Sequence, residues 1–168
     1  MNIILTGYRG SGKTTIGKAL AKRLKREFID TDDLIEEKER MKIKDIFDKR
    51  GWQYFRKVEK LVIQELAKRD NAVIAVGGGA FMYKENLCLE ENARVVLLIA
   101  PLEVISERIK SDPNRPPLTE GQSSIEEIRD VWGRRKERYY SLADAVVDTG
   151  DGDVKRAVEE IAVKLNLE

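Results

Sequence analysis

Short apolar runs alternate along the chain with longer segments in which apolar residues recur every three or four positions. The short runs predict buried strands, which we place at residues 2–6, 28–30, 72–76, 94–100 and 143–147. The longer segments predict helices after residue 13, around 58–66, from 101 to 110 and from 154 to 165. Strands that alternate with helices form parallel sheets covered on both faces. The pattern therefore predicts an α/β fold.

Length and charge favour a single domain that acts on a small molecule. With 168 residues, of which 42% are hydrophobic, the chain can bury one large core but not two, so we treat residues 1–168 as one domain. The 31 Lys and Arg residues nearly balance the 30 Asp and Glu residues, which does not favour binding to nucleic acid or to a membrane surface. We expect small-molecule substrates and a monomer.

Residue types that are rare or missing narrow the location and the chemistry. Cys88 has no second cysteine to pair with, the N-terminus lacks signal-peptide features, and no stretch approaches the roughly 20 apolar residues of a membrane span. These features favour a cytoplasmic protein. Histidine is absent, which excludes a Ser-His-Asp triad, a histidine-bound zinc and a phosphohistidine. A general base must then be a carboxylate, a lysine, a tyrosine or water.

The stretch GYRGSGKT at residues 7–14 fits the pattern G-x-x-x-x-G-K-[ST] between a predicted strand and a predicted helix. In such a phosphate-binding loop, backbone N–H groups at the N-terminus of a helix turn toward a triphosphate. We expect Lys13 to reach the β- and γ-phosphates and the Thr14 hydroxyl to bind Mg²⁺. The alternative is a glycine-rich turn that only links strand to helix, which both flanking elements disfavour. The expected nucleotide-binding residues of the loop are Gly10, Ser11, Gly12, Lys13, Thr14 and Thr15.

Acidic residues follow the second predicted strand, in the stretch FIDTDDLIE at 28–36. The C-terminal ends of parallel strands face the ligand crevice, so these acids should lie near the phosphate loop. We expect Asp30 to join the metal shell and Asp32 to face the hydroxyl of an acceptor. The alternative is that these residues only cap a helix that begins near Leu34, a role that suits Asp33 best.

Two further segments suit ligand binding. Gly77, Gly78 and Gly79 end a predicted strand, where a ligand can approach the backbone closely, although a flexible turn is the plainer interpretation. The segment at 111–124, SDPNRPPLTEGQSS, has the composition of a solvated loop. Its Arg115 instead favours a mobile lid that excludes water and neutralises charge on a transferring phosphoryl group.

In combination, these motifs resemble those of the shikimate kinase family, small P-loop enzymes of aromatic amino-acid biosynthesis, over essentially the full length. The phosphate loop alone is shared by many unrelated activities, but its combination with the later motifs in this order is specific. The matching positions are 7–14, Asp30-Thr31-Asp32, Phe55-Arg56 with Glu59, Gly77-Gly78-Gly79, Arg115-Pro116, and Arg135 followed by Tyr139.

The resemblance implies a three-layer fold like that of nucleoside monophosphate kinases, with five parallel strands in the order 2-3-1-4-5. It also implies a mobile lid at about 111–124 and an acceptor-binding region at about 32–60. The implied reaction transfers a phosphoryl group from ATP to shikimate and gives ADP and shikimate 3-phosphate. Whether Asp32 acts as the general base or only orients the hydroxyl stays open, because a loose transition state can delay deprotonation.

The resemblance also implies roles by position. Shikimate would be bound by Asp32 through ring hydroxyls, by Arg56 and Arg135 through the carboxylate, and by Gly78 and Gly79.

On the nucleotide side, Arg108 and the loop at 149–153, with Asp151, would flank adenine. Lys13 and Arg115 would absorb charge on the transferring group together with Mg²⁺. Thr14 and Asp30 would hold the metal, Asp30 through water.

Two positions depart from the family pattern. Trp52 stands where Glu commonly follows the glycine, and Pro117 where Leu commonly follows Arg-Pro. We expect neither to touch a residue with a chemical role, so that only the substrate rim and the stiffness of the lid are affected.

Two other functions compete with this interpretation. One is another small-molecule kinase of the same fold, such as a gluconate or nucleotide kinase, and the other is a nonenzymatic ATP-binding switch. A nucleotide acceptor needs a base pocket, which the paired arginines do not suggest. A switch could dispense with Asp32, Arg56 and Arg135, all of which are present.

Overall fold

The computed structural model describes residues 1–110 and 124–167. Its strands are β1 (Asn2–Thr6), β2 (Glu27–Asp30), β3 (Ala72–Ala75), β4 (Ala93–Ile99) and β5 (Ala145–Asp148). Its α-helices are α1 (Lys13–Leu24), α2 (Thr31–Glu39), α3 (Ile43–Leu66), α4 (Leu102–Lys110), α5 (Ser124–Leu142) and α6 (Val154–Lys164). Two 3₁₀ helices, η1 (Ala80–Met82) and η2 (Lys84–Leu89), lie between β3 and β4.

The sheet is parallel throughout, with the strand order β2-β3-β1-β4-β5, which confirms the predicted order. In the central strand β1, Ile4 is in register with Ile74 of β3 and Val95 of β4. Every residue of β1 is buried, as expected for a strand between two layers of helices. Because the strands are parallel, the loops after β1, β2 and β3 meet at one edge of the sheet.

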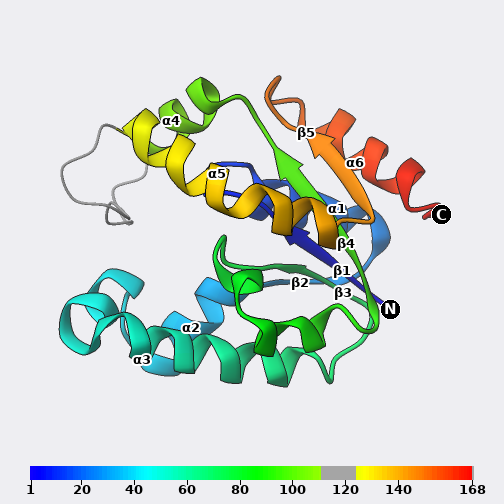
Figure 1. Cartoon of the computed structure of the whole chain (residues 1–168). Helices are drawn as coiled ribbons and strands as arrows, with labels where there is room; N and C mark the ends of the chain where they lie inside the picture. Colours follow the sequence, from blue (N-terminus) through cyan, green and yellow to red (C-terminus); the bar gives the residue numbers. More distant parts are fainter. Residues whose placement is uncertain (111–123, 168) are drawn as a thin grey trace.

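Helices cover both faces of the sheet and give the predicted three layers (Figure 1). Ile3 and Leu5 of β1 pack in a cluster with residues of α1 and α6, whereas Ile4 packs in a second cluster with residues of α2 and α3. This split follows from the alternation of side chains along a strand. Within the described residues, no helix is both long enough and apolar enough to cross a membrane.

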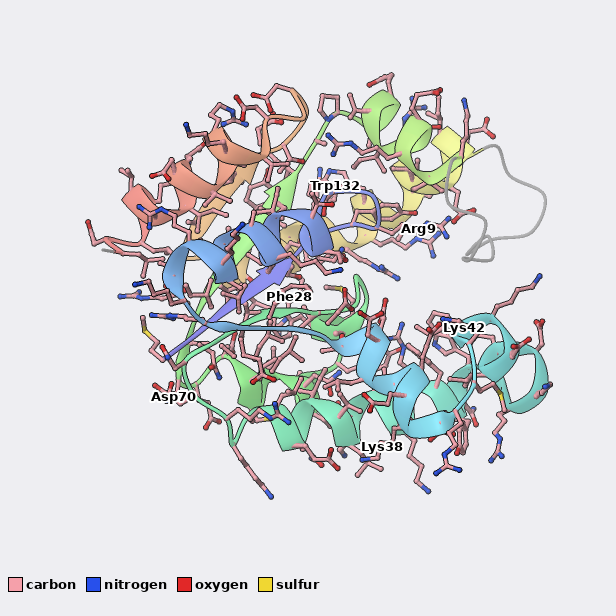
Figure 2. The ribbon with its side chains drawn as sticks, turned by 180° about the vertical axis from the view of Figure 1, so that it is seen from behind. Arg9, Phe28, Lys38, Lys42, Asp70 and Trp132 are labelled. Carbon is pink, nitrogen blue, oxygen red and sulfur yellow. The ribbon has the colours of Figure 1, made fainter. Side chains whose placement is uncertain are left out.

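The contact between α1 and β2 is close because Gly17 has no side chain. A Cβ at Gly17 would lie 2.3 Å from the ring of Phe28. Figure 2 shows Phe28 below α1, between the helix and the lower half of the molecule. The tight contact keeps the end of β2 near the start of α1, where the phosphate loop ends.

Three local features differ from the sequence-based expectations. α2 begins at Thr31 rather than near Leu34, and its N-cap is Asp30, not Asp33, because Asp30 Oδ1 accepts the Asp32 N–H at 3.0 Å. α3 starts at Ile43 and bends at Gly51, whose φ of 79° favours glycine. The 3₁₀ helices were not predicted, because such short helices show no clear apolar period.

Candidate active site

Two adjoining cavities lie at the C-terminal edge of the sheet. The larger has a volume of about 480 Å³ and is lined by the phosphate loop, and the smaller has a volume of about 100 Å³ and is lined by α3 and the loop after β3. Arg9 and Asp32 line both cavities. Molecules bound in the two cavities would therefore be neighbours, which a direct group transfer requires.

The larger cavity contains most of the predicted nucleotide-binding residues. Lys13 Nζ donates hydrogen bonds to the carbonyl oxygens of Gly7 and Tyr8, at 2.9 and 3.0 Å, so the ammonium lies over the turn of its own loop. Ser11 is fully buried and does not line the cavity. The loop residues that do line it are Gly10, Gly12, Lys13, Thr14 and Thr15, together with Arg9.

Thr14 and Asp30 bring an alcohol oxygen and a carboxylate oxygen together in the larger cavity. Thr14 Oγ1 donates a hydrogen bond to Asp30 Oδ2 at 2.9 Å, while Asp30 Oδ1 caps α2. Mg²⁺ prefers such oxygen ligands and usually takes only one or two from the protein, with phosphates and water completing its shell. Among the described residues, no group of three or more Asp, Glu, Cys or His side chains could hold a metal. The pair therefore fits an ion that binds together with a nucleotide.

Arg108 joins the two walls of the larger cavity. Its guanidinium donates to the carbonyl oxygens of Gly10, at 3.1 Å, and Thr149, at 2.6 Å. Thr149 Oγ1 in turn donates to the carbonyl oxygen of Ser11 at 2.8 Å. The loop after β5 is thus attached to the phosphate loop. Asp151 is not among the lining residues, and its carboxylate pairs with Arg156 at 2.5 Å, whereas Gly152 and Asp153 do line the cavity.

The smaller cavity contains every residue predicted to bind shikimate, namely Asp32, Arg56, Gly78, Gly79 and Arg135. α2, α3, the loop after β3 and α5 each contribute to this set. At Gly79 the two guanidinium groups converge, since a Cβ there would lie 2.6 Å from Arg56 Nη2 and 3.4 Å from Arg135 Nη2. Two planar cations on one small cavity suit a carboxylate ligand.

Glu59 holds Arg56 in this position. Arg56 Nη1 donates to Glu59 Oε2 at 2.5 Å, and the Glu59 side chain is only 1% exposed. Burial raises the pKa of the Glu59 carboxyl, and the nearby charge of Arg56 offsets this only in part. Glu59 is thus a buried partner that fixes one edge of the guanidinium.

Tyr139 links the glycine-rich loop to α5. Its hydroxyl donates a hydrogen bond to the carbonyl oxygen of Gly78, and the side chain is fully buried. Burial raises the pKa of Tyr139 above its ordinary value, so the phenol remains a proton donor at neutral pH. One turn earlier, Arg135 lines the cavity, so the same helix carries the arginine and fixes the backbone opposite it.

The expectation that Trp52 touches no residue with a chemical role is wrong. The guanidinium carbon of Arg56 lies 4.5 Å from the centroid of the Trp52 ring. Trp52 and Arg56 lie four residues apart on α3 beyond the bend at Gly51, and sequence reasoning missed their contact because the predicted helix covered only residues around 58–66. Pro117, the other departure, lies outside the described residues, as do Arg115 and the rest of the predicted lid up to residue 123.

Arg9 is a second residue that sequence reasoning missed. It occupies a variable position of the phosphate-loop pattern, yet it lines both cavities and pairs with Glu127 of α5 at 2.8 Å. The Glu127 side chain is 3% exposed, so the pair is well buried. Figure 2 shows Arg9 beside α5. The sequence feature that could have indicated its role is a basic residue at a variable position of the phosphate-loop motif.

Comparison with known proteins points to one family. The family model described as "Shikimate kinase" matches residues 9–166. The shikimate kinase of Sulfurihydrogenibium sp. (strain YO3AOP1) is 40% identical over 165 residues, which cover 98% of this chain and 97% of the relative. That of Francisella tularensis subsp. holarctica (strain OSU18) is 43% identical over 166 residues, which cover 98% and 94%.

Solved structures give the same result. A shikimate kinase from Acinetobacter baumannii in complex with shikimate has a TM-score of 0.92 at 36% identity, covering 98% of this chain and 93% of that chain. A shikimate kinase from Aquifex aeolicus VF5 has a TM-score of 0.84 at 35% identity, covering 99% and 96%. The sequence motifs and the strand order thus agree with both comparisons, and the chain belongs to the shikimate kinase family.

Proposed function

We propose that the larger cavity binds ATP, that the smaller cavity binds shikimate, and that the γ-phosphoryl group passes between them to give shikimate 3-phosphate. The protein is an ATP-dependent shikimate kinase of aromatic amino-acid biosynthesis. The observation that carries the proposed arrangement is the shared lining by Asp32 and Arg9, next to the two guanidinium groups of the smaller cavity.

On the nucleotide side, the backbone N–H groups of residues 10–15 would surround the phosphates at the N-terminus of α1. Lys13 would contact the β- and γ-phosphates, and Arg108 would keep the loop after β5 in place beside the nucleotide. Thr14 and Asp30 would hold Mg²⁺, which offsets phosphate charge when bound. Ser11 would contribute only its backbone, because its side chain is buried.

On the acceptor side, Arg56 and Arg135 would bind the carboxylate of shikimate, since planar guanidinium groups donate paired hydrogen bonds to carboxylates. Asp32 would accept hydrogen bonds from ring hydroxyls. Gly78 and Gly79 would let the ring approach the backbone, because a side chain at Gly79 would displace Arg56. These roles agree with a ligand that has an acidic group at one end and hydroxyls at the other.

Catalysis in this arrangement consists mainly of positioning and charge stabilisation. Asp32 lies where it can orient the attacking hydroxyl and take up its proton, early or late in the transfer. Lys13 and, from the segment at 111–124, Arg115 would stabilise charge on the transferring group. Arg115→Ala should accordingly lower kcat strongly with little change in the melting temperature Tm.

An ADP-release assay tests the proposal when shikimate, gluconate and nucleoside monophosphates are each offered with ATP and Mg²⁺. We expect turnover with shikimate alone. Turnover with gluconate or a nucleotide would favour another kinase of this fold, and ATP binding without any acceptor turnover would favour a switch. Asp32→Asn serves as the internal control, because it should lower shikimate turnover without preventing nucleotide binding.

We further propose that residues 1–168 act as one domain, with the acceptor-binding region at about 32–60, and that the protein works as a cytoplasmic monomer. The length of 168 residues supports a single domain, and the single cysteine supports a reducing compartment. Light scattering after size exclusion, with and without both substrates, tests the oligomeric state.

A further inference from the structure

Arg56 lies among aromatic rings that the assigned chemistry does not explain. Its guanidinium carbon is 4.5 Å from the ring centroid of Trp52, 4.9 Å from that of Tyr83 and 5.2 Å from that of Phe55. Trp52 Nε1 also donates a hydrogen bond to the Tyr83 hydroxyl at 3.4 Å. The two rings belong to segments that lie side by side, the bent helix α3 and the stretch between the 3₁₀ helices (Figure 1).

The bend at Gly51 lets the ring of Trp52 stack on that of Phe47. Residues five apart on a regular helix point in different directions, yet the rings of Phe47 and Trp52 stack with centroids 4.9 Å apart and an angle of 17° between their planes. Gly51, with its φ of 79°, turns the chain between them. Beyond the bend the helix is regular, so Trp52 and Arg56, four residues apart, share one face.

The rings attract the cation without using its hydrogen-bond donors. A guanidinium over an aromatic ring interacts through the face of the ring, whereas its N–H groups lie in the guanidinium plane. Glu59 accepts a hydrogen bond from Arg56 Nη1, whereas Arg56 Nη2 lies beside Gly79, which lines the smaller cavity. The rings therefore restrict the orientation of Arg56 while donors remain for a carboxylate.

Both rings are themselves partly in solvent. Trp52 is 43% exposed and Tyr83 is 38% exposed, so burial of their own surface is incomplete. The part of each ring that is covered includes the contact with Arg56. An exposed cation–π contact makes only a small contribution to folding stability, and Trp52 lines the smaller cavity beside Arg56.

We propose that Trp52 and Tyr83 are positioning residues that set the affinity for the acidic acceptor by orienting Arg56. This inference rests on the proposed role of Arg56 toward the carboxylate of shikimate. It predicts that loss of either ring weakens acceptor binding only as long as Arg56 is present. A ring that touched shikimate directly, or that only stabilised α3, would act whether or not Arg56 is present.

The test is a double-mutant cycle of Trp52→Leu and Arg56→Ala, read as kcat/KM for shikimate and KM for ATP. We expect Trp52→Leu to lower kcat/KM for shikimate about three- to tenfold through KM, with kcat and the KM for ATP within about twofold of wild type. In the Arg56→Ala background, Trp52→Leu should lower kcat/KM for shikimate by less than about twofold. Trp52→Phe, which keeps a ring, should retain most of the affinity.

Leu61→Ala is the matched control, because Leu61 lies on the same helix, is 44% exposed and lines neither cavity. Thermal melts establish whether each variant folds. If Trp52→Leu does not fold, Tyr83→Leu takes its place in the cycle. A full effect of Trp52→Leu in the Arg56→Ala background would overturn the inference, as would wild-type kinetics of Trp52→Leu. If Arg56→Ala alone leaves the KM for shikimate unchanged, the proposed role of Arg56 fails first.

Discussion

The hydroxyl of Thr14 donates a hydrogen bond to Asp30 Oδ2 across 2.9 Å, which joins the phosphate loop to the end of β2. The other carboxylate oxygen of Asp30 caps α2. One side chain therefore stabilises a helix and also presents an oxygen to the nucleotide cavity. These two tasks can be separated by substitution, because an amide can also cap a helix.

Asp30→Asn should impair metal use without unfolding α2. The amide oxygen can still accept the Asp32 N–H, so Tm should change by only a few degrees. The lost negative charge should raise the Mg²⁺ concentration for half-maximal activity several-fold, measured by titration after chelation. Asp33→Asn, an exposed change in the same helix, is the control. Equal Mg²⁺ dependence of wild type and Asp30→Asn would contradict the assignment.

Lys13→Met should lower kcat by about two orders of magnitude or more, because the ammonium stabilises charge that develops on the transferring group. The fold should persist, since Lys13 donates hydrogen bonds to the carbonyl oxygens of Gly7 and Tyr8, at 2.9 and 3.0 Å, which belong to its own loop rather than to a distant element. Steady-state ADP release and a thermal melt provide the two readouts. Lys18→Met removes an exposed charge from the same helix and should leave kcat unchanged. Comparable turnover in both variants would rule out the assigned role.

Arg56→Ala and Arg135→Ala should each raise the KM for shikimate far more than the KM for ATP. A hydrogen bond to a charged group contributes about 1.5 to 3 kcal/mol, which corresponds to at least a tenfold change in affinity. The measurement is initial rate against each substrate, with the other saturating. A parallel rise of both KM values would count against recognition of the carboxylate by these residues.

Arg56→Ala should also make stability depend on pH. The substitution leaves Glu59 buried at 1% exposure without its partner, which costs about 3 to 5 kcal/mol when the carboxylate is charged. The folded-state pKa of Glu59 is already raised by burial, and loss of Arg56 raises it further. Because the pKa of Glu59 is higher in the folded than in the unfolded protein, its contribution to stability is fully present below the unfolded-state pKa. That contribution is lost as the pH rises through the folded-state pKa, where the buried carboxyl must ionise.

The loss of unfolding free energy in Arg56→Ala, relative to wild type, should therefore grow from acidic toward neutral pH. Denaturant titrations at several pH values measure this loss. Arg135→Ala is the comparison, because Arg135 forms no salt bridge with the described residues and lowers the pKa of Glu59 less than Arg56 does. A deficit for Arg56→Ala that is constant with pH would mean that Glu59 does not titrate in this range.

Gly78→Ala and Gly79→Ala should give different kinetic defects. A Cβ at Gly79 meets side-chain nitrogens of Arg56 and Arg135, at 2.6 and 3.4 Å, so its main effect should be a higher KM for shikimate. A Cβ at Gly78 meets the backbone oxygen of Gly7 at 3.2 Å, so it should disturb the phosphate loop and affect ATP as well. Identical kinetic profiles of the two variants would contradict this division of the loop.

The sequence was sufficient for those features that depend on local pattern. Apolar runs such as that of β1 located the strands. Asp30 is the last residue of β2 and Asp32 follows it, which was enough to place both at the ligand edge. The phosphate loop carries its own signature, so Lys13 and Thr14 could be assigned before the fold was known.

Features that depend on a change of chain direction were not predictable in this way. The stacking of Trp52 on Phe47, with ring centroids 4.9 Å apart, depends on the bend at Gly51, which lies within a segment of otherwise helical pattern. Tyr83, which accepts the hydrogen bond of Trp52, is 31 positions away in the chain and lies in an irregular segment between two 3₁₀ helices. The pairing of Arg9 with Glu127 spans 118 positions, and only the packing of α5 beside the phosphate loop creates it.

The attachment of Arg108 to Gly10 and Thr149 has a consequence for the growing chain during synthesis. The wall that these bonds hold together combines the loop after the first strand with the loop after the last one. A nascent chain that lacks β5 and α6 has the complete phosphate-loop signature but only one side of the nucleotide cavity. We therefore expect nucleotide affinity to arise late, when the C-terminal elements dock, and bound nucleotide to stabilise the finished domain rather than its precursors.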